Sequence, residues 1–383
     1  MRIAIVYDCL YPLNTGGGER VYRRMAELLV DRGHSVDYLT RDQWGDADAP
    51  AAPFTVVPVW SGEIYDAEGG RRAAAAAGFA LAVFRELRRR RGEYDLVIVS
   101  ALPVLNVFAA RAATIGTRTR LLSDWLEVWT WRKWREYSGA LVGTIASVLQ
   151  WFALRLTAGA TVNSSFTRDR VRRYRRRLRP IVLGLLDLAG EPRRPSAVAS
   201  RPGLVLFAGR HIPDKQLTAL PAAIAVAHDA DPAVRAVVVG SGPETEALRR
   251  AVAEHGVGEL FDIRGRVDDD ELERLFAEAA VLVNPSRREG FGLVVAEAAA
   301  VGTPSVVVAG DDNAAVDLIV EGVNGFVAAD AGPQALGGAI ARAVAGGQQL
   351  RTSTAEWFVS ASRSQNLSRS VDEILERYGS SAR

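Results

Sequence analysis

The sequence predicts an α/β protein made of two domains, each built around a parallel β-sheet. Its 383 residues are enough for two domains of ordinary size, and a hydrophobic content of 48% is enough for two packed cores. Short β-rich runs alternate with helical stretches along the chain, which is typical of parallel strands connected by helices. A segment rich in Pro, Ala, Ser and Arg, residues 188–202, predicts a linker between domains at 1–187 and 203–362.

The first domain is expected to open with a strand, a glycine loop and a helix. Residues 2–8, RIAIVYD, have the pattern of a buried strand, and the amphipathic segment VYRRMAELLVDRG follows. The expected helix start at Glu19 is preceded by Gly16, Gly17 and Gly18. Such a loop offers free backbone N–H groups and the positive end of a helix dipole to an anion. Alone it is a weak signal, because it lacks the G-x-G-x-x-G spacing of a dinucleotide-binding loop.

Positive charge is concentrated in the first half of the chain. Residues 1–190 contain 28 Lys or Arg and 19 Asp or Glu, a net charge of +9, whereas the remainder has a net charge of −7. The longest basic run is TRDRVRRYRRRLR, residues 167–179. Runs of one sign indicate an anionic surface as partner. Nucleic acid is not expected, because aromatic residues are not interleaved with the arginines in a stacking pattern, and a membrane surface fits better.

Two apolar stretches lie near the basic clusters, at residues 73–84 and 139–154. Both are shorter than the roughly 20 residues that span a bilayer. They could lie in the membrane interface with arginines on their flanks. Alternatively both are helices buried against the first sheet, and the arginines are simply solvated. The sequence leaves both interpretations open.

The second domain is expected to begin with a strand, GLVLFA, followed by a basic loop. Arg210 and Lys215 lie five residues apart in this loop. A basic pair at the carboxyl end of a parallel strand suits a diphosphate, because Arg offers a planar fork of donors and Lys a point charge. An ordinary solvated loop is the alternative.

The most informative segment is EGFGLVVAE, residues 289–297. The apolar run VLVNPS precedes it and helix-forming residues follow, which predicts a strand, a tight turn and a helix. Glu289 would lie on the loop at the strand's carboxyl end and Glu297 about two turns into the helix, so that both face one crevice. Two carboxylates there can accept hydrogen bonds from sugar hydroxyls. The alternative is that Glu289 caps the helix and Glu297 is solvated.

These three segments together resemble those of the retaining glycosyltransferases of family 4. The carboxylate spacing resembles the family's Glu-x7-Glu motif, the basic loop its pyrophosphate-binding segment, and GGGER its N-terminal glycine loop. The chain departs from the family at Gln216, where Gly is usual. The resemblance implies a GT-B fold, with two Rossmann-like domains whose parallel sheets face across a central cleft. It also implies a last helix, residues 364–380, that packs back on the first domain.

The resemblance implies roles for the residues of these motifs. Glu289 would lie near the donor sugar, and Glu297 would hold the ribose hydroxyls of the nucleotide. Arg210 and Lys215 would bind the pyrophosphate, and the glycine loop would face the donor. Further substrate-binding residues are expected at Arg266, Gly290, Phe291, Gly292 and Leu293.

One departure concerns a histidine that the family usually carries on a loop after a mid-domain strand of the first domain. Here the strand is predicted as TRLL and the loop as SDWLEVWTWRKW, and the first domain has no histidine after His34. The corresponding position falls at Ser123 or, as a second choice, at Leu126. Asp124 and Glu127 are then the nearest polar candidates, and Asp124, one residue from the first choice, is expected to take the catalytic role toward the sugar. The tryptophans of this loop suit a sugar ring, an interfacial lipid or a packed loop.

No metal or other cofactor is expected. The single cysteine, Cys9, excludes an internal disulfide and a cysteine metal site. Two segments, Asp46–Asp48 and Asp268–Asp270, match the loose Asp-x-Asp pattern of metal-dependent transferases, but the second is predicted to start a helix. The first strand begins almost at Met1, so no signal peptide is expected. The expected location is the cytoplasm, or the inner face of the cell membrane.

The expected function is transfer of a hexose from a UDP- or GDP-sugar to a hydroxyl of a glycan or a lipid-linked acceptor, with retention of configuration. Basic side chains and the glycine loop would stabilise the leaving diphosphate. One alternative is a non-catalytic partner subunit that binds a nucleotide-sugar, which the missing histidine supports. Another is an epimerase on the same fold, although the motifs contain no acid–base pair for it. The sequence leaves the donor sugar, its base and the acceptor open.

Overall fold

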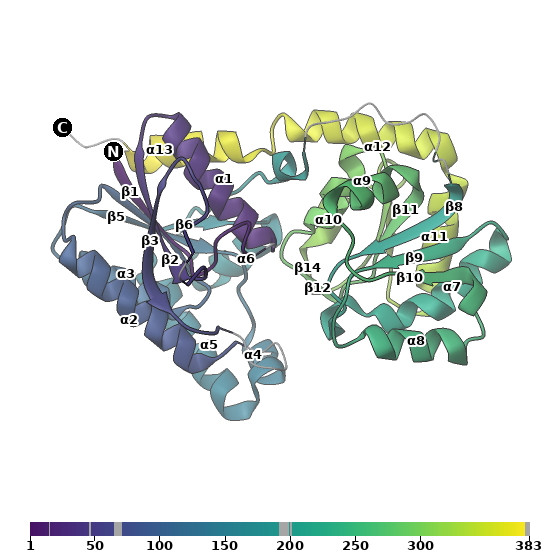
Figure 1. Cartoon of the computed structure of the whole chain (residues 1–383), viewed down its shortest axis with the longest axis horizontal. Helices are drawn as coiled ribbons and strands as arrows, with labels where there is room; N and C mark the ends of the chain where they lie inside the picture. Colours follow the sequence, from purple (N-terminus) through teal and green to yellow (C-terminus); the bar gives the residue numbers. More distant parts are fainter. Residues whose placement is uncertain (15, 46, 65–70, 191–198, 200, 380–383) are drawn as a thin grey trace. The chain divides into compact units, whose positions relative to one another are not determined.

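The computed structural model describes residues 1–14, 16–45, 47–64, 71–190, 199 and 201–379. They form two compact units, one of Met1–Leu188 with Asn366–Arg383 and the other of Ala189–Gln365. Each unit is a parallel β-sheet with helices packed against it (Figure 1). The prediction of two parallel α/β domains is therefore confirmed. Most of the expected linker lies outside the described residues.

Seven parallel strands form the sheet of the first unit, in the order β3-β2-β1-β4-β5-β6-β7. The strands are β1 (Arg2–Val6), β2 (Ser35–Asp42), β3 (Thr55–Ser61), β4 (Leu96–Ser100), β5 (Arg120–Trp125), β6 (Gly159–Val162) and β7 (Ile181–Val182). The helices are α1 (Gly17–Asp31), α2 (Ala73–Arg89), α3 (Leu105–Thr114), α4 (Trp131–Ser138), α5 (Ala140–Leu156), α6 (Ser165–Tyr174) and the 3-10 turn η1 (Leu186–Ala189). The central strands β1 and β4 are mostly apolar because helices cover both faces of a parallel sheet, whereas β5 also carries the buried polar residues Ser123 and Asp124.

The last helix, α13 (Leu367–Gly379), belongs to the first unit and lies beside α1 (Figure 1). The Arg32 guanidinium donates to Asp372 at 2.6 Å and to the Ser368 carbonyl at 2.9 Å. The backbone N–H of Leu367 donates to the Asp187 carboxylate at 2.8 Å. These bonds fasten the C-terminal helix to the unit that contains the N-terminus.

The second unit has a six-stranded parallel sheet in the order β10-β9-β8-β11-β13-β15, and a separate two-stranded pair, β12-β14. Its strands are β8 (Arg201–Ala208), β9 (Arg235–Val239), β10 (Phe261–Ile263), β11 (Ala279–Asn284), β12 (Arg288–Glu289), β13 (Ser305–Val308), β14 (Asp312–Asn313) and β15 (Gly325–Ala328). Its helices are η2 (Pro213–Lys215), η3 (Leu217–Ala219), α7 (Leu220–Ala230), α8 (Thr245–Glu254), η4 (Gly258–Leu260), α9 (Asp269–Glu278), α10 (Leu293–Ala300), η5 (Ala314–Leu318), α11 (Pro333–Ala345) and α12 (Gly347–Ser362).

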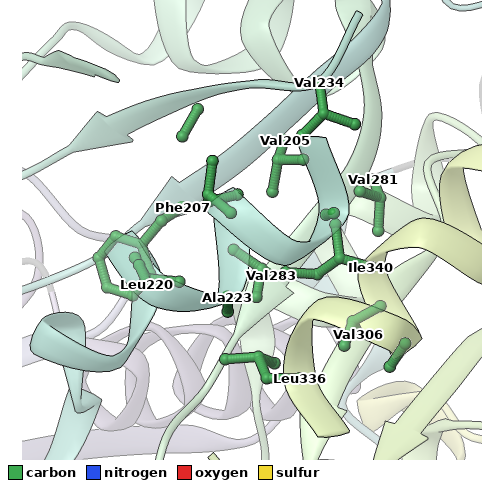
Figure 2. Packing of buried hydrophobic residues seen from close by; sticks show 14 of the residues in the cluster. Val205, Phe207, Leu220, Ala223, Val234, Val281, Val283, Val306, Leu336 and Ile340 are labelled. Carbon is green, nitrogen blue, oxygen red and sulfur yellow. The ribbon is translucent and has the colours of Figure 1, made fainter. Parts of the chain in front are cut away.

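The core of the second unit lies between one face of its sheet and the helices α7 and α11. Figure 2 shows valines of β8, β11 and β13 packed against Leu220 and Ala223 of α7 and against Leu336 and Ile340 of α11. The two helices approach closely at Gly337, where an added Cβ would lie 2.6 Å from the Ala223 carbonyl oxygen. This packed layer holds β8 and β11, whose carboxyl ends carry the predicted site.

The two apolar stretches of the first domain have different environments. In α2, Phe79, Val83 and Leu87 are buried against the sheet, so the first stretch belongs to the core. In α5, by contrast, most of the large apolar side chains are exposed. Neither α5 nor any other helix among the described residues is both long and apolar enough to cross a membrane.

Candidate functional site

The predicted motif residues of the second unit follow two neighbouring strands. Strand β8 leads into the loop of Arg210 and Lys215, and β11 leads to Glu289. Because β8 and β11 are adjacent and parallel, both segments leave the sheet at the same edge. The predicted order of strand, tight turn and helix over residues 281–300 is confirmed, with a two-residue strand, β12, inside the turn.

The loop after β8 is fastened to the segment that precedes Glu289. Asp214 accepts ion-pair contacts from Arg287 at 3.1 Å and from Arg288 at 2.7 Å. The backbone N–H of Arg287 also donates to the Asp214 carbonyl oxygen at 2.9 Å. These contacts fix the positions of the neighbouring residues, Lys215 and Glu289, relative to each other.

Three polar side chains surround one carboxylate oxygen of Glu289. The Lys215 ammonium donates to its Oε1, and the Asn284 amide and the Ser286 hydroxyl each lie 3.2 Å from the same atom. The Lys215 and Glu289 side chains are only 17% and 15% exposed. The structure therefore joins the predicted cation and the predicted carboxylate into one ion pair at the edge of the sheet.

Asn284 and Ser286 were not identified as site residues from the sequence. Both are buried, and the single hydroxyl proton of Ser286 is shared between the Asn284 side-chain oxygen, which is the nearer acceptor, and Glu289. Asn313 is a third such residue: it pairs with Glu289 across β12 and β14, and its amide donates to the carbonyl oxygens of Ser286 and Val308 at 3.0 and 2.8 Å. Buried amides of this kind stabilise an irregular turn because its backbone groups need partners. For Asn284 and Ser286, the available signal was a polar residue at or just after the end of an apolar strand.

Arg210 lies exposed on the loop after β8. Within the part of the chain that the structure describes, no carboxylate forms an ion pair with it. The structure thus gives the two predicted phosphate-binding cations different environments, one exposed and one in an ion pair.

The segment after Glu289 forms the tight turn and the start of α10. Gly292 is the N-cap of this helix with φ of +95°, and an added Cβ would lie 2.7 Å from the Ala315 Cβ. A side chain at Gly292 is therefore disfavoured by both conformation and space. Gly290, Phe291 and Leu293 lie half-buried around this turn, and Glu297 is half-buried in the helix. The structure brings these residues to the same edge of the sheet as Lys215.

Arg266 lies on the turn after β10, and its side chain is exposed. In the sheet, β10 is separated from β8 by β9, and the Gly240 N–H donates to the Gly265 carbonyl oxygen at 3.1 Å. Arg266 therefore shares the carboxyl edge with the other predicted residues but stands two strands away from the Lys215 loop.

His211 is a buried residue of the same loop that the sequence did not single out for a role. Its Nδ1 lies 2.8 Å from the Thr245 hydroxyl, and its backbone groups bond to Ser241 and Glu244 at 3.0 and 2.9 Å. Burial lowers the pKa of the His211 imidazole, so the neutral form is favoured. His211 joins the loop after β8 to the start of α8 and therefore has a structural role.

The conformation of Gln216 gives a physical reason for glycine at this position. Gln216 has φ of +47° and ψ of +42°, a left-handed conformation that is costly for a residue with a side chain. We expect Gln216→Gly to raise the free energy of unfolding of this unit by about 0.5–1 kcal/mol, because glycine adopts this conformation without a steric penalty. Urea denaturation would measure it. The neighbouring variant Thr218→Gly should lower stability instead, and a loss of stability in Gln216→Gly would contradict the expectation.

In the first unit, the glycine segment forms the start of α1. The helix begins at Gly17, two residues before the expected start at Glu19, and Gly16 is its N-cap in an extended conformation. An added Cβ on Gly18 would lie 2.9 Å from the Tyr7 hydroxyl and 3.5 Å from Leu126. The helix start is thus packed closely over the carboxyl ends of β1 and β5.

The expected position of Ser123 and Asp124 on a loop is wrong. Strand β5 continues to Trp125, because Asp124 and Trp125 pair with Thr161 and Val162 of β6. Ser123 and Asp124 are both 0% exposed. The Asp124 carboxylate accepts hydrogen bonds from the Tyr22 hydroxyl at 2.5 Å and the Thr161 hydroxyl at 2.6 Å. Both of its oxygens are engaged inside the unit, which is at odds with a catalytic contact to a sugar.

Leu126, the second choice for the histidine position, is the first residue after β5. It is half-buried and lies beside Gly18 at the start of α1. The structure therefore favours Leu126 over Ser123 as the residue that corresponds to the missing histidine. The sequence pattern could not separate the two, because the end of β5 depends on its pairing with β6.

The structure also bears on the candidate metal motifs. Asp268 is the N-cap of α9 and accepts the backbone N–H of Glu271 at 2.8 Å, which confirms the predicted helix start. Asp46 lies outside the described residues. Among the residues that are described, no group of three or more His, Cys, Asp or Glu side chains is arranged to hold a metal ion.

Two protein-family models match the chain, one on each domain. The model of glycosyltransferase family 4 matches residues 15–183, and the model of glycosyl transferases group 1 matches residues 190–376. The first match includes the glycine segment, and the second includes the basic loop and both motif glutamates.

Curated relatives match over parts of their length. A D-inositol 3-phosphate glycosyltransferase from Streptomyces griseus is 35% identical over 183 residues, covering 43% of this chain and 38% of that protein. The GtfA subunit of a UDP-N-acetylglucosamine–peptide N-acetylglucosaminyltransferase from Streptococcus gordonii is 30% identical over 126 residues, covering 33% of this chain and 24% of that protein. These matches span well under two thirds of either relative.

Solved structures match over nearly the whole chain. Sucrose-phosphate synthase from Thermosynechococcus elongatus superposes with a TM-score of 0.79 at 20% identity, covering 99% of this chain and 98% of that one. HepE from Anabaena, in complex with UDP and glucose, has a TM-score of 0.71 at 19% identity, covering 99% of both chains. With the two family models extending over most of its length, the chain belongs to the family 4, group 1 glycosyltransferases and has the GT-B fold.

Proposed function

We propose that the chain transfers a hexose from a UDP- or GDP-sugar to a hydroxyl of a glycan or a lipid-linked acceptor, with retention of configuration and without a metal ion or other cofactor. The observation that carries the proposal is the fastened pair of Lys215 and Glu289 at the sheet edge, with Arg210 on the same loop. A UDP-glucose complex of the distantly related HepE supports a donor of this class.

The chemistry follows from the charges that develop when the anomeric bond breaks. Negative charge grows on the leaving diphosphate, and positive charge grows on the sugar. Arg210 and Lys215 stabilise the first, because preformed cations need no reorganisation during the reaction. The start of α10 adds backbone N–H groups and the positive end of its dipole. Glu289, fixed by its donors, accepts hydrogen bonds from the sugar hydroxyls.

Glu297 is assigned to the ribose of the nucleotide. A ribose contact is made in the ground state and in the transition state alike, so it contributes to affinity more than to turnover. The exposed Arg266, two strands away on the same edge, is assigned to the far end of the nucleotide. The retaining course adds no protein nucleophile: the acceptor hydroxyl attacks the face from which the diphosphate leaves, and the diphosphate takes its proton.

We expect Glu297→Ala to weaken binding of the nucleoside diphosphate by roughly 10- to 100-fold, the cost of a lost hydrogen bond to a charged group. Turnover at saturating donor should change much less. Titration calorimetry with UDP or GDP would measure the affinity, and Glu246→Ala, an exposed carboxylate of α8, is the matched control. Wild-type affinity in Glu297→Ala would remove Glu297 from the nucleotide site.

A panel of UDP-, GDP- and ADP-sugars tests the proposed function. A thermal-shift screen identifies the nucleotide, because a ligand that binds only the folded state raises Tm. Release of nucleoside diphosphate then identifies the donor, and its dependence on an added acceptor distinguishes transfer from hydrolysis. Activity that follows one donor, needs an acceptor and survives chelation of metals supports the proposal. A requirement for a divalent cation or inversion in the product contradicts it.

A second candidate function is a non-catalytic subunit that binds a nucleotide-sugar and partners an active transferase. The observation that favours it is Leu126, an apolar side chain beside Gly18 where the family usually has histidine. This candidate predicts a thermal shift with a nucleotide-sugar but no release of nucleoside diphosphate with any acceptor. A gain of donor hydrolysis in Leu126→His would then show that the remaining site is intact.

A further inference from the structure

The α4–α5 hairpin, residues 131–156, exposes an unusual amount of apolar surface. It contributes nine of the sixteen exposed large hydrophobic side chains of the described residues. Four of them, Leu141, Ile145, Val148 and Phe152, are 49–76% exposed and recur at the spacing of one helix face. A contiguous apolar face of this kind marks an interaction site.

The hairpin is a built structure and not a loose segment. Gly143 of α5 lies against the Trp134 carbonyl of α4, where a side chain would overlap the backbone. The buried Gln150 donates to the Trp129 carbonyl at 2.7 Å, and its own oxygen accepts the Trp129 N–H at 2.9 Å and the Trp134 indole at 3.1 Å. The buried side of α5 is therefore satisfied, and the apolar residues on its other side are exposed.

Basic and aromatic side chains lie on the same hairpin and on the helix that packs on it. Arg135 stacks over the Trp131 ring at 4.4 Å, and Arg155 stacks over the Trp151 ring at 4.5 Å. Helix α6 packs on α5. Residues of α6 and of the turn after it line a hollow, namely Asp169, Arg172, Arg173 and Arg176. Residues 131–179 carry twelve Lys or Arg and two Asp or Glu. Three guanidinium groups at one hollow suit a phosphate.

The charge pattern decides between possible occupants. In a symmetric dimer through this face, the same arginines of the second copy would approach one another, and like charges oppose such an interface. A phospholipid surface supplies what each part of the face needs: phosphates for the arginines, an interface for the tryptophans and acyl chains for the aliphatic side chains.

We infer that the α4–α5 hairpin, together with the arginines of α6 and of the turn that follows it, docks the chain onto an anionic phospholipid surface. Leu141, Ile145, Val148 and Phe152 enter the acyl region, and Arg172, Arg173 and Arg176 contact headgroup phosphates. Docking would bring the chain to a membrane that holds a lipid-linked acceptor. Only this link to the acceptor rests on the proposed function. Of the two apolar stretches of the first domain, only the one in α5 is assigned to the membrane, because the stretch in α2 is part of the core.

Vesicle flotation tests the inference on the full chain. We expect recovery with vesicles of phosphatidylglycerol and phosphatidylcholine in equal amounts, and none with phosphatidylcholine alone. Changing Arg172, Arg173 and Arg176 together to Ser should weaken vesicle affinity roughly 100-fold, and added salt should do the same to the wild type. Changing Leu141, Ile145, Val148 and Phe152 to Ser should abolish recovery while leaving Tm unchanged, because these side chains are exposed.

Matched controls separate this surface from general charge and hydrophobicity. Arg249 and Arg250 are exposed on α8, and replacing both removes two positive charges, against three in the test variant. Leu81 of α2 and Ile115 are exposed apolar residues elsewhere. Serine variants of these four should float like the wild type. Arg175 is left intact because it donates to the Arg155 carbonyl at 2.5 Å and thereby caps α5.

Each outcome decides the inference. It is overturned if the wild type does not float with anionic vesicles at low salt, or if the hairpin variants float like the wild type. A dimer that the hairpin variants convert to a monomer would assign the face to a second copy. Release of nucleoside diphosphate from a donor is measured without vesicles, so failure of docking and failure of the proposed transfer are recorded separately.

Discussion

Replacing Lys215 with alanine is expected to lower kcat/KM for the nucleotide-sugar donor roughly 30- to 1,000-fold. This corresponds to a loss of about 2–4 kcal/mol of transition-state stabilisation. The Lys215 ammonium has three N–H donors and gives one to Glu289, so it can hold the carboxylate and a phosphate oxygen together. Alanine removes the cation from the leaving diphosphate. It also leaves a carboxylate that is only 15% exposed without its charged partner. Steady-state release of nucleoside diphosphate over a range of donor concentrations would measure the loss.

Arg210→Ala separates the two parts of this effect. Arg210 is exposed and has no ion-pair partner among the described residues, so its loss should lower kcat/KM similarly but leave stability unchanged. Lys215→Ala should in addition lower the free energy of unfolding by about 1–3 kcal/mol. Combining Lys215→Ala with Glu289→Gln should then cost less stability than the sum, because the two residues contact each other.

Arg249→Ala is the matched control for the change in net charge. Arg249 pairs with Glu246 on the exposed surface of α8, so its loss should affect neither turnover nor stability. Wild-type turnover of Lys215→Ala at saturating donor would argue against a diphosphate at this loop. The Lys215–Glu289 pair would then be a structural ion pair of the turn.

The sequence was most informative where local pattern and function coincide. Residues 281–300 pass from an apolar strand through a glycine turn to a helix. The conformation of this segment therefore depends mainly on local preferences. The helix start at Asp268 was predictable for the same reason, because an N-cap is a local hydrogen bond. The ion pair between Lys215 and Glu289 was not predictable, because their loops are brought together by the pairing of β8 with β11.

The sequence-based predictions were wrong or undecided where strand pairing extends an element or where packing decides which face of a helix is buried. Strand β5 was expected to end before Ser123, but its register with β6 carries it to Trp125. The two apolar stretches of the first domain have similar compositions, and only packing shows that Phe79 and Val83 are buried whereas Ile145 and Val148 are exposed. Composition shows how apolar a helix is, but it does not determine which face of the helix is buried by another element.

Replacing Asp124 with alanine is expected to lower the free energy of unfolding of the first unit by about 2–4 kcal/mol, a fall in Tm of roughly 5–15 °C. The fully buried carboxylate is the acceptor for the Tyr22 hydroxyl of α1 and the Thr161 hydroxyl of β6. Alanine leaves both hydroxyls buried without this acceptor. Thermal unfolding followed by circular dichroism would measure the loss.

The two hydroxyl partners provide the control for this stability effect. Tyr22→Phe and Thr161→Val each remove one donor, so each should cost less than Asp124→Ala. In the Asp124→Ala background the same two changes should cost little or restore stability, because removing both partners of a buried hydrogen bond is nearly neutral. Additive losses in the triple variant would contradict the assignment of Asp124 as their shared acceptor.

The pH dependence of stability gives a second signature. Burial raises the pKa of the Asp124 carboxyl, and the hydrogen bonds from Thr161 and Tyr22 oppose that rise. A carboxyl whose pKa is higher in the folded state contributes stability that is fully present below the unfolded pKa of about 3.9 and is lost as pH rises through the folded pKa. Asp124→Asn cannot ionise, so its stability relative to the wild type should increase as pH rises from about 3.5 toward neutral.

The same variants decide whether Asp124 contacts a sugar, as its place in the sequence suggested, or organises the unit, as its burial indicates. A sugar contact predicts that Asp124→Asn lowers turnover more than tenfold at unchanged Tm and unchanged donor affinity. A structural role predicts the opposite result, with altered stability and altered pH dependence of stability, and with a turnover that follows the folded fraction.

Tyr22 makes the structural role relevant to catalysis, because its ring stacks on Tyr7 at 4.3 Å and the Tyr7 hydroxyl lies against Gly18. Loss of Asp124 should therefore loosen the start of α1, and hydrogen exchange at the amides of Gly17 and Gly18 should rise in Asp124→Ala before the unit unfolds.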